Sequence, residues 1–526
     1  MACLLKKVFL TVCLMALLPM NIHAQAQAED VLATLRRAND YFMKKYADPT
    51  LPTFVKKERP SSLWTRAVYY EGLMALYEVD PQQRYAGYVD RWANFHQWTP
   101  RDGIQTCDAD NQCCSQTYLM RYQQVGGEEK LLPTQLNLEH QMRTKIGWWT
   151  WIDAIQMAMP VYAQMTTITG DDRYMEHAMK MYRWSRDTLA GGLFNEKEGL
   201  WWRDKDFVPP YREPDGKQCY WSRGNGWVYA ALVRCLKAMD EDKRPKARDR
   251  MRERDLLRRD FVRMSKALLR CQREDGLWNV SLTSNNYAGK ELTGTALFLY
   301  GMSWGISTGL LPAKAYRPAC DRAWQALQRD CIHANGFLGW VQGTGKEPKD
   351  GQPLSYTRIP DFEDFGTGCL LLGGAEYYKL LASTLPSHPQ LKATSTTKAG
   401  ARWWWMGSAV DKENLRWNME EYARTGIGTL EITPIYGVQG NSGNNIEFLS
   451  DKYMEMLRFV MDEGKRLGIE IDMATGTGWP FGGPWVPLEE SACRAVFVVK
   501  TFKGHEVVGL DLLPAEKDRK NCICRR

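Results

Sequence analysis

Histidine is scarce in this chain, with seven in 526 residues. The histidines form no spaced cluster, and the cysteines are scattered, so the sequence predicts no metal centre and no cofactor. No basic tract is interleaved with aromatics, and the net charge of +7 is spread along the chain, which argues against a nucleic-acid partner. The apolar run Val8 to Leu18 is too short to span a bilayer, and no stable membrane insertion is expected.

The N-terminus instead has the pattern of an export signal. Lys6 and Lys7 precede the apolar run, and Ala24-Gln25-Ala26 places small residues at a cleavage site. We therefore expect residues 1–26 to be a cleaved signal peptide and the protein to be periplasmic or secreted. That compartment allows disulfides, but the spacing of the cysteines does not reveal a pairing.

What the chain has in excess is tryptophan, with 21 residues. Large cores use tryptophan, but indole faces also stack on the C–H faces of sugars, which favours a carbohydrate-handling protein. The chain is 44% hydrophobic and 25% charged, as in globular proteins, and it is too long for one ordinary core.

Residues 30–382 show paired apolar stripes of helical period, separated by glycine-aromatic loops such as Gly199-Leu200-Trp201. The stripes occur at 62–78 and 84–97, 157–168 and 174–182, 227–239 and 257–271, 293–308 and 318–330, and 367–381. Six hairpins of about 59 residues each would fill this region. The pattern predicts an all-α (α/α)6 double toroid whose loops line a pocket at one rim.

The remaining sequence has a different composition and periodicity. Residues 383–400 are rich in Ser, Thr, Pro and Lys and are predicted to be a linker. Strand-like and helix-like runs then alternate, at 402–410, 412–425, 428–435, 449–467 and 469–474. The alternation predicts an incomplete α/β segment with parallel strands over 401–515, followed by an unstructured tail at 516–526.

Two segments carry the candidate site: Trp149-Thr150-Trp151-Ile152-Asp153 and Trp221-Ser222-Arg223-Gly224-Asn225-Gly226-Trp227. The glycines would let the backbone approach a ligand, and the tryptophans offer flat apolar faces. Arg223 has the planar fork of donors that suits a carboxylate, and Asp153 is an acid among aromatics. Together they predict a site for an acidic sugar. The alternative is that the second segment is a tight turn packed by two large side chains.

Several motifs between residues 60 and 382 resemble glycoside hydrolase family 105, which is related to the unsaturated glucuronyl hydrolases of family 88. The resemblance is carried by segments 151–154, 157–160, 169–174, 199–204, 221–227, 291–296 and 365–368. It implies an (α/α)6 toroid that acts on a 4,5-unsaturated uronic acid at the non-reducing end of a lyase-generated oligosaccharide. In pectin-related members that oligosaccharide is unsaturated rhamnogalacturonan.

The resemblance also implies a mechanism and residue roles. An acid protonates C4 of the enol ether, water adds at C5, and the hemiketal collapses; ordinary glycosidases instead flank the scissile bond with two carboxylates. Asp153 matches the general acid/base, with a pKa raised by its apolar surroundings. Asp110 is the expected second acid, with Asp108 as the alternative, and an N-cap role is the competing interpretation. The implied substrate-binding residues are Trp151, Trp221, Arg223, Asn225, Trp227 and Arg203, the last standing where some relatives have a histidine.

The second part resembles the start of glycoside hydrolase family 106, the α-L-rhamnosidases. The matching segments are 402–406, 431–437 and 476–483. The catalytic carboxylates of that family come from later segments than this sequence contains, so we expect a truncated domain with open strand edges and no rhamnosidase activity. A rhamnosidase-like segment beside an unsaturated-uronide hydrolase points to rhamnogalacturonan.

Two other functions remain as alternatives. A polysaccharide lyase or sugar epimerase could use the same toroid, but a lyase requires a base such as Tyr/His or Arg/Lys, and no histidine motif lies near Asp153. A non-catalytic sugar-binding protein would keep the aromatics and lose only turnover. The oligomeric state is not predicted.

Overall fold

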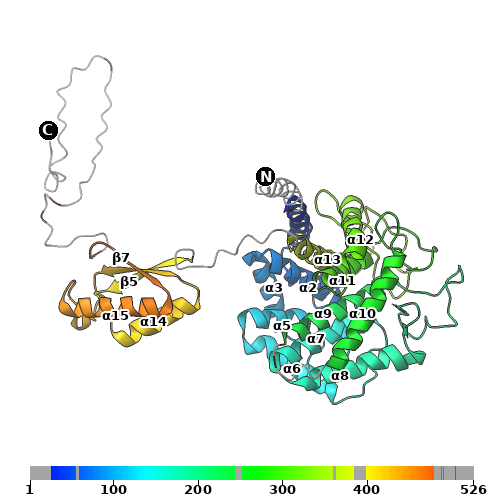
Figure 1. Cartoon of the computed structure of the whole chain (residues 1–526), viewed down its shortest axis with the longest axis horizontal. Coiled ribbons are helices and arrows are strands. Elements are labelled where there is room, and N and C mark those ends of the chain that lie inside the picture. The colour runs from blue at the N-terminus through cyan, green and yellow to red at the C-terminus, as the bar shows by residue number, and fades with distance from the viewer. Residues whose placement is uncertain are drawn as a thin grey trace, which may run out of the picture. The chain divides into compact units, whose positions relative to one another are not determined.

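The computed structural model describes residues 25–54, 58–242, 244, 251–358, 363–383 and 398–478, with single positions at 487, 490 and 504. The chain divides into two compact units, residues 1–387 and 388–526 (Figure 1). Residues 1–24 of the expected signal peptide, most of the expected linker and the expected tail lie outside the described residues.

Six inner helices form a closed ring in the first unit. Each contacts the next, and the last contacts the first. In ring order they are α2 (Trp64–Val79), α5 (Cys114–Val125), α7 (Asp153–Thr169), α9 (Ser222–Glu241), α11 (Leu292–Ser307) and α13 (Asp364–Ala382). The prediction of an (α/α)6 toroid is confirmed.

A second layer of helices packs outside the ring (Figure 1). Five of its helices pack on the inner helix that precedes them in the chain. These are α3 (Gln83–Phe95), α6 (Glu128–Met142), α8 (Asp172–Arg183), α10 (Met251–Cys271) and α12 (Ala313–Ala326). The sixth position is filled by the helix at residues 25–45, whose Leu35 reaches Gly374 of α13.

The two layers differ in sequence for a physical reason. The inner helix α11 is buried at every position from Leu292 to Gly305, so it is apolar nearly all round. The outer helix α8 is amphipathic and buries one face, including Tyr174, Met175 and Ala178, while its other face is polar. A helix that contacts neighbours on all sides needs no polar face, whereas an outer helix does.

Glycines allow the ring to close between α2 and α13. A Cβ placed on Gly72 would lie 2.4 Å from the carbonyl oxygen of Gly368, and one on Gly368 would lie 2.2 Å from the carbonyl oxygen of Val68. The two backbones therefore approach more closely than any side chain permits.

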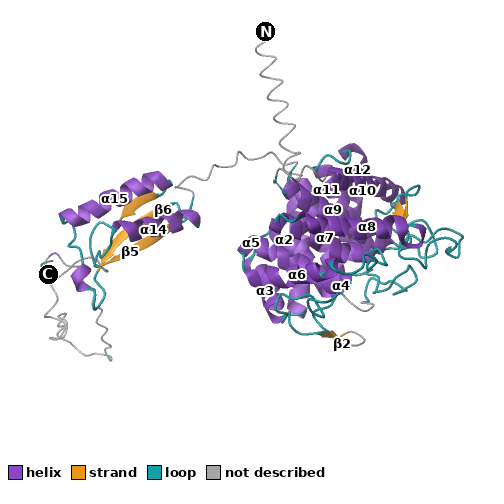
Figure 2. Ribbon diagram, turned by 90° about the horizontal axis from the view of Figure 1, so that it is seen from below, coloured by secondary structure: helices purple, strands orange, loops and turns teal. Residues whose placement is uncertain are grey.

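The sequence stripes missed three helices. Neither α5 nor α6 has a stripe in the predicted set, and the stripe at 367–381 had no partner. The structure pairs that stripe with residues 25–45, at the opposite end of the chain, and Gln27 donates to the Tyr377 hydroxyl at 3.1 Å. Short elements complete the unit: α4 (Ala109–Gln112), β1 (Thr53–Phe54), β2 (Glu58–Arg59), β3 (Phe194–Asn195) and β4 (Leu200–Trp201) (Figure 2).

The second unit contains a parallel sheet of three strands in the order β5 (Gly400–Met406), β6 (Thr429–Ile435) and β7 (Glu470–Met473). Helices α14 (Lys412–Arg424) and α15 (Asp451–Leu467) connect the strands and contact each other, so both cover one face (Figure 2). Each element lies within two residues of its predicted position, except that β5 ends four residues earlier. On the other face Trp404 and Met406 are 41% and 49% exposed.

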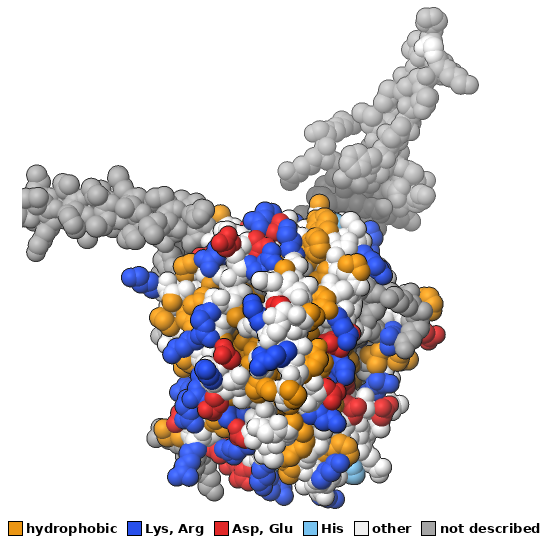
Figure 3. Space-filling model, turned by 90° about the vertical axis from the view of Figure 1, so that its right-hand side faces the viewer, with side chains coloured by type: hydrophobic (Ala, Val, Ile, Leu, Met, Phe, Trp, Pro, Cys, Tyr) orange, Lys and Arg blue, Asp and Glu red, His pale blue; other side chains and the backbone are white. Residues whose placement is uncertain are grey.

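Within the described residues, no helix is long and apolar enough to cross a membrane. On the face shown in Figure 3, Lys and Arg side chains are interspersed with Asp and Glu. The nine described cysteines are all unpaired, and Cys113 and Cys114 are buried where α4 meets α5.

Candidate active site

The two predicted acids lie at the beginnings of neighbouring inner elements. Asp153 is the first residue of α7, and Asp110 lies in the single turn α4, which leads into α5. Asp108 is the N-cap of α4, since its carboxylate accepts from the Asp110 backbone N–H at 2.9 Å. The capping role weighed for Asp110 therefore belongs to Asp108, which is exposed. Asp110 is half-buried and electrostatically coupled to Asp153.

Burial raises the pKa of both acids. The pKa of Asp110 is raised to about 7, first by burial and then by the negative charges of Asp108 and Asp153. The pKa of Asp153 is also raised by burial, and the positive charges of Arg203 and Arg223 oppose that rise. Two coupled carboxyls in a poorly solvated site can hold a proton near neutral pH, as a general acid must.

Arg203 is the cation in contact with Asp153. Its Nε lies 3.3 Å from Asp153 Oδ2, and its Nη1 donates to Asp204 Oδ2 at 2.7 Å. A backbone bond from the Ile152 N–H to the Arg203 carbonyl, 2.9 Å long, and a β-bridge between Trp151 and Asp204 fix the two segments together. The Arg203 side chain is 20% exposed, so its guanidinium is accessible beside the acids.

The Arg223 guanidinium does not face the site as the sequence led us to expect. Its Nη1 and Nη2 donate to the backbone carbonyls of Gln342 and Gly343, each at 2.7 Å, and the residue is 1% exposed. Its guanidinium also stacks on the rings of Trp221 and Phe365, at 4.7 and 5.0 Å from their centroids. In this structure Arg223 anchors a loop, and Arg203 is the arginine whose guanidinium is accessible beside the aspartates.

Three further residues predicted to bind substrate are also buried. Trp221 donates from Nε1 to Gln342 Oε1 at 2.8 Å, and Trp227 packs edge-on against Trp64. Asn225 accepts from the Trp201 N–H at 2.8 Å and donates to the Trp201 carbonyl at 3.0 Å, so it fixes β4. All three are at most 1% exposed. The structure thus places these side chains in the packing around the site, and of the predicted aromatics only Trp151 is half-buried.

The glycines of segment 221–227 serve helix packing. They lie in the first turns of α9, and neither has a positive φ. A Cβ on Gly226 would lie 2.8 Å from Leu297 of α11, and one on Gly224 would lie 2.7 Å from the Trp221 ring. We expected these glycines to let the backbone approach a ligand. In the structure they instead allow close packing of α9 against its neighbours.

Sequence reasoning missed Gln342, which organises the loop behind the site. Its Nε2 donates to the carbonyls of Glu347, Pro348 and Asp350, at 3.1, 3.3 and 2.8 Å, while its Oε1 accepts from Trp221. Its position after Trp340 in a glycine-aromatic loop gave no local signal. Among the described residues, no three His, Cys, Asp or Glu side chains are arranged to hold a metal ion.

Comparison with known proteins connects this geometry to a family. Residues 34–381 match the model of Glycosyl Hydrolase Family 88. The chain belongs to glycosyl hydrolase family 88. It is a glycosidase, and the matched region covers both aspartates and all of the inner ring except the last residue of α13. Residues 392–517 match the alpha-L-rhamnosidase model of family 106, in agreement with the second resemblance.

Three relatives illustrate how closely this family 88 chain resembles known proteins. An unsaturated 3S-rhamnoglycuronyl hydrolase from Formosa agariphila is 29% identical over 337 residues, covering 60% of this chain and 84% of the relative. A family 88 glycosyl hydrolase structure from Bacteroides vulgatus is 29% identical with a TM-score of 0.59, over 67% of this chain and 99% of that one. A structure described as a polysaccharide lyase is 27% identical with a TM-score of 0.60, over 68% of this chain and 99% of that one.

Proposed function

We propose that this family 88 glycosidase removes a 4,5-unsaturated uronic acid from the non-reducing end of oligosaccharides generated by a polysaccharide lyase. The observation that carries the proposal is the coupled pair Asp110 and Asp153, whose pKa values are both raised, beside the accessible guanidinium of Arg203. The name of the Formosa agariphila relative, an unsaturated 3S-rhamnoglycuronyl hydrolase, supports the substrate class.

The reaction follows from the pair's ability to hold a proton. Asp153 gives a proton to C4 of the enol ether, and the positive charge that develops at C5 is taken by water. The Asp153 carboxylate takes a proton from that water, which leaves a hemiketal at C5. The ring then opens, and the hemiacetal left at C1 breaks down and releases the rest of the oligosaccharide. Arg203 binds the uronate carboxylate with its planar fork, and Trp151 offers a ring face for the sugar.

The substrate is proposed to be a pectic, rhamnogalacturonan-derived oligosaccharide, as the resemblance to family 105 implies. The rhamnosidase match in the same chain supports a rhamnose-containing substrate. Export by the N-terminal segment would bring the enzyme to polysaccharides outside the cytoplasm, and we include export in the proposal.

The deciding experiment follows the ultraviolet absorbance of the conjugated unsaturated uronide. A hydrolase removes this absorbance from lyase-treated rhamnogalacturonan, whereas a lyase, the alternative raised by one structural neighbour, creates it from intact polymer. We expect Asp153→Asn to lower kcat by about a hundred- to ten-thousand-fold with little change in Tm. An Asp153→Asn protein within a few-fold of wild type would contradict the assignment, and retained binding without any wild-type turnover would indicate a sugar-binding protein.

A further inference from the structure

One fully buried carboxylate of the inner ring, Glu71, is bonded to residues close in sequence to both aspartates. Glu71 of α2 has no exposed surface. It is also the only charged residue between Val68 and Tyr77, in an otherwise apolar or aromatic stretch. A fully buried acid costs free energy unless partners surround it, so its partners indicate why it is there.

The two oxygens of Glu71 hold the two elements that carry the aspartates. Oε1 accepts from the thiol of Cys113 at 3.3 Å, and Oε2 accepts from Gln156 Nε2 at 2.9 Å. Cys113 lies three residues after Asp110, and Gln156 lies three residues after Asp153. Three residues are close to one helical turn, so each tether lies directly below its aspartate.

Other contacts make this connection rigid. The Cys113 N–H bonds to the Asp110 carbonyl at 3.4 Å, so the thiol and the aspartate share one turn. Gln116 Nε2 donates to the Gln156 carbonyl at 2.8 Å, which joins α5 directly to α7. Burial raises the pKa of the Cys113 thiol, so it stays protonated and can donate.

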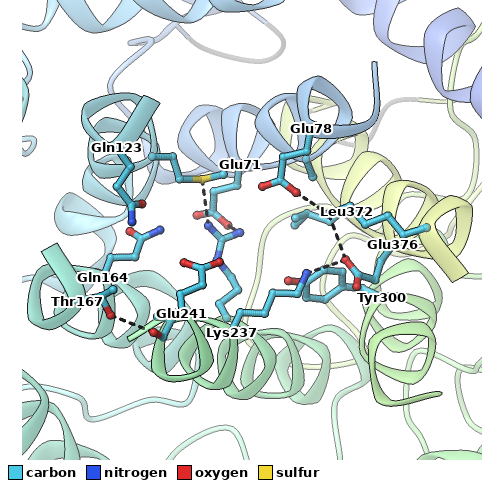
Figure 4. A pocket seen from close by; sticks show the side chains of 15 residues that line it. Glu71, Glu78, Gln123, Gln164, Thr167, Lys237, Glu241, Tyr300, Leu372 and Glu376 are labelled. Carbon is cyan, nitrogen blue, oxygen red and sulfur yellow. Dashed lines mark hydrogen bonds and ion pairs between the residues drawn. The ribbon is translucent and has the colours of Figure 1, made fainter. Parts of the chain in front are cut away.

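Arg234 of α9 provides the counter-charge. Its Nη1 lies 3.3 Å from Glu71 Oε2, and its side chain is 9% exposed. Figure 4 shows Glu71 at the wall of a pocket of about 110 Å³ that also contains the ion pair of Lys237 with Glu376, at 2.6 Å. This pocket is lined by residues from the later turns of the inner helices, whereas Asp153 begins α7, so Glu71 separates the pocket from the aspartates.

We propose that Glu71 is a positioning residue that sets the separation of Asp110 and Asp153; the proposal rests on the proposed function of that pair. The mutual effect of two carboxyls depends on their distance, and a displacement of about 1 Å costs roughly a hundredfold in rate. A carboxylate that binds both supporting turns fixes that distance more directly than apolar packing does.

The first test replaces Glu71 with glutamine in the full chain. In Glu71→Gln an NH2 group replaces one of the two acceptor oxygens. If it replaces Oε1, the bond from the Cys113 thiol is lost. If it replaces Oε2, its N–H groups face the N–H donors of Gln156 and Arg234. We expect kcat to fall about 10- to 100-fold with KM changed less than about threefold. We also expect the alkaline limb of the pH profile to move to lower pH, because greater separation and better hydration of the two aspartates lower their pKa values. The charged groups around Asp110 that contribute to this limb are Asp108, Asp153, Arg203 and Arg101.

The matched control is Glu376→Gln. Glu376 is also a buried acid paired with a cation in the same pocket, at 5% exposure, but its bonding partner Lys237 belongs to α9, away from both aspartates. We expect this variant to lower Tm and leave kcat, KM and the pH profile unchanged. If Glu71→Gln likewise changes only Tm, the positioning role is wrong.

Two further variants decide the question if Glu71→Gln folds poorly. Cys113→Ser keeps a donor for Glu71 and should retain kcat, whereas Cys113→Ala removes the tether and should lower it. Equal kcat for the serine and alanine variants would overturn the proposal. Asp153→Asn is assayed alongside: if it keeps turnover, the proposed function fails whatever the Glu71 result, and if it is inactive while the Glu71 and Cys113 variants are normal, only the positioning role fails.

Discussion

Asp110 differs from a surface carboxylate because burial and the charges of Asp108 and Asp153 raise its pKa to about 7. In the unfolded chain the pKa returns to about 3.9. Between these values the folded state holds a proton that the unfolded state releases, so Asp110 contributes less stability as pH rises from about 4 to 7. The site is therefore maintained at a cost in stability at alkaline pH.

Asp110→Asn should remove that cost. The variant is expected to raise Tm by roughly 2–4 °C at pH 8 and by less at pH 5, while abolishing most activity. Thermal unfolding of both proteins across this pH range measures the difference. A gain in Tm that is the same at pH 5 and pH 8 would show that charge is not its cause.

The two arginines near Asp153 should respond differently to substitution. Arg203→Ala removes the accessible guanidinium and should raise KM about tenfold or more, and the effect should disappear on substrates whose carboxylate has been reduced to an alcohol. Arg223→Lys loses paired bonds to the carbonyls of Gln342 and Gly343, so it should mainly lower Tm. A KM effect of Arg223→Lys that depends on the substrate carboxylate would restore the original sequence hypothesis for that residue.

At the scale of elements, the contact between α2 and α13 closes the ring. Gly72→Ala would place a methyl group 2.4 Å from the Gly368 carbonyl oxygen, so the helices must separate. We expect a loss of about 1–3 kcal/mol in the free energy of unfolding. Denaturant unfolding measures it.

Gly87→Ala on the outer helix α3 is the matched control. A Cβ there meets nothing within 4 Å, and alanine favours a helix over glycine, so stability should stay the same or rise by about 0.5–1 kcal/mol. Equal losses at Gly72 and Gly87 would mean that the ring tolerates separation of α2 from α13.

At the scale of the whole molecule, the residues assigned to the site all belong to the first unit. A protein ending at Ser383 should therefore keep kcat/KM for unsaturated uronides within about threefold of the full chain. The second unit supplies three described strands, fewer than the eight of a closed parallel barrel, so the full chain should not cleave an aryl α-rhamnoside. Cleavage of the rhamnoside by the full chain would contradict the second expectation. Loss of uronide hydrolysis in the protein ending at Ser383 would contradict the first.

Much of the fold could be predicted from sequence because its signals are local. The stripe at 62–78 overlaps α2 from Trp64 onward, and the stripe at 227–239 lies within α9. The alternation after residue 400 gave three parallel strands in order. The pairing of residues 25–45 with α13 could not be predicted, since nothing in either segment specifies a partner more than 300 residues away.

The helical periods, the strand–helix alternation and the aspartate-bearing segments could be predicted because each depends on residues within a few positions of each other. Which side chains face the site depends instead on contacts between distant parts of the chain. Arg223 donates its hydrogen bonds to carbonyls that lie 119 and 120 residues further along the chain, and Glu71 accepts a hydrogen bond from Gln156, 85 residues away in sequence. Burial and hydrogen bonding at that separation are properties of the closed ring, so a motif such as 221–227 marks the neighbourhood of the site without showing which of its residues contact substrate.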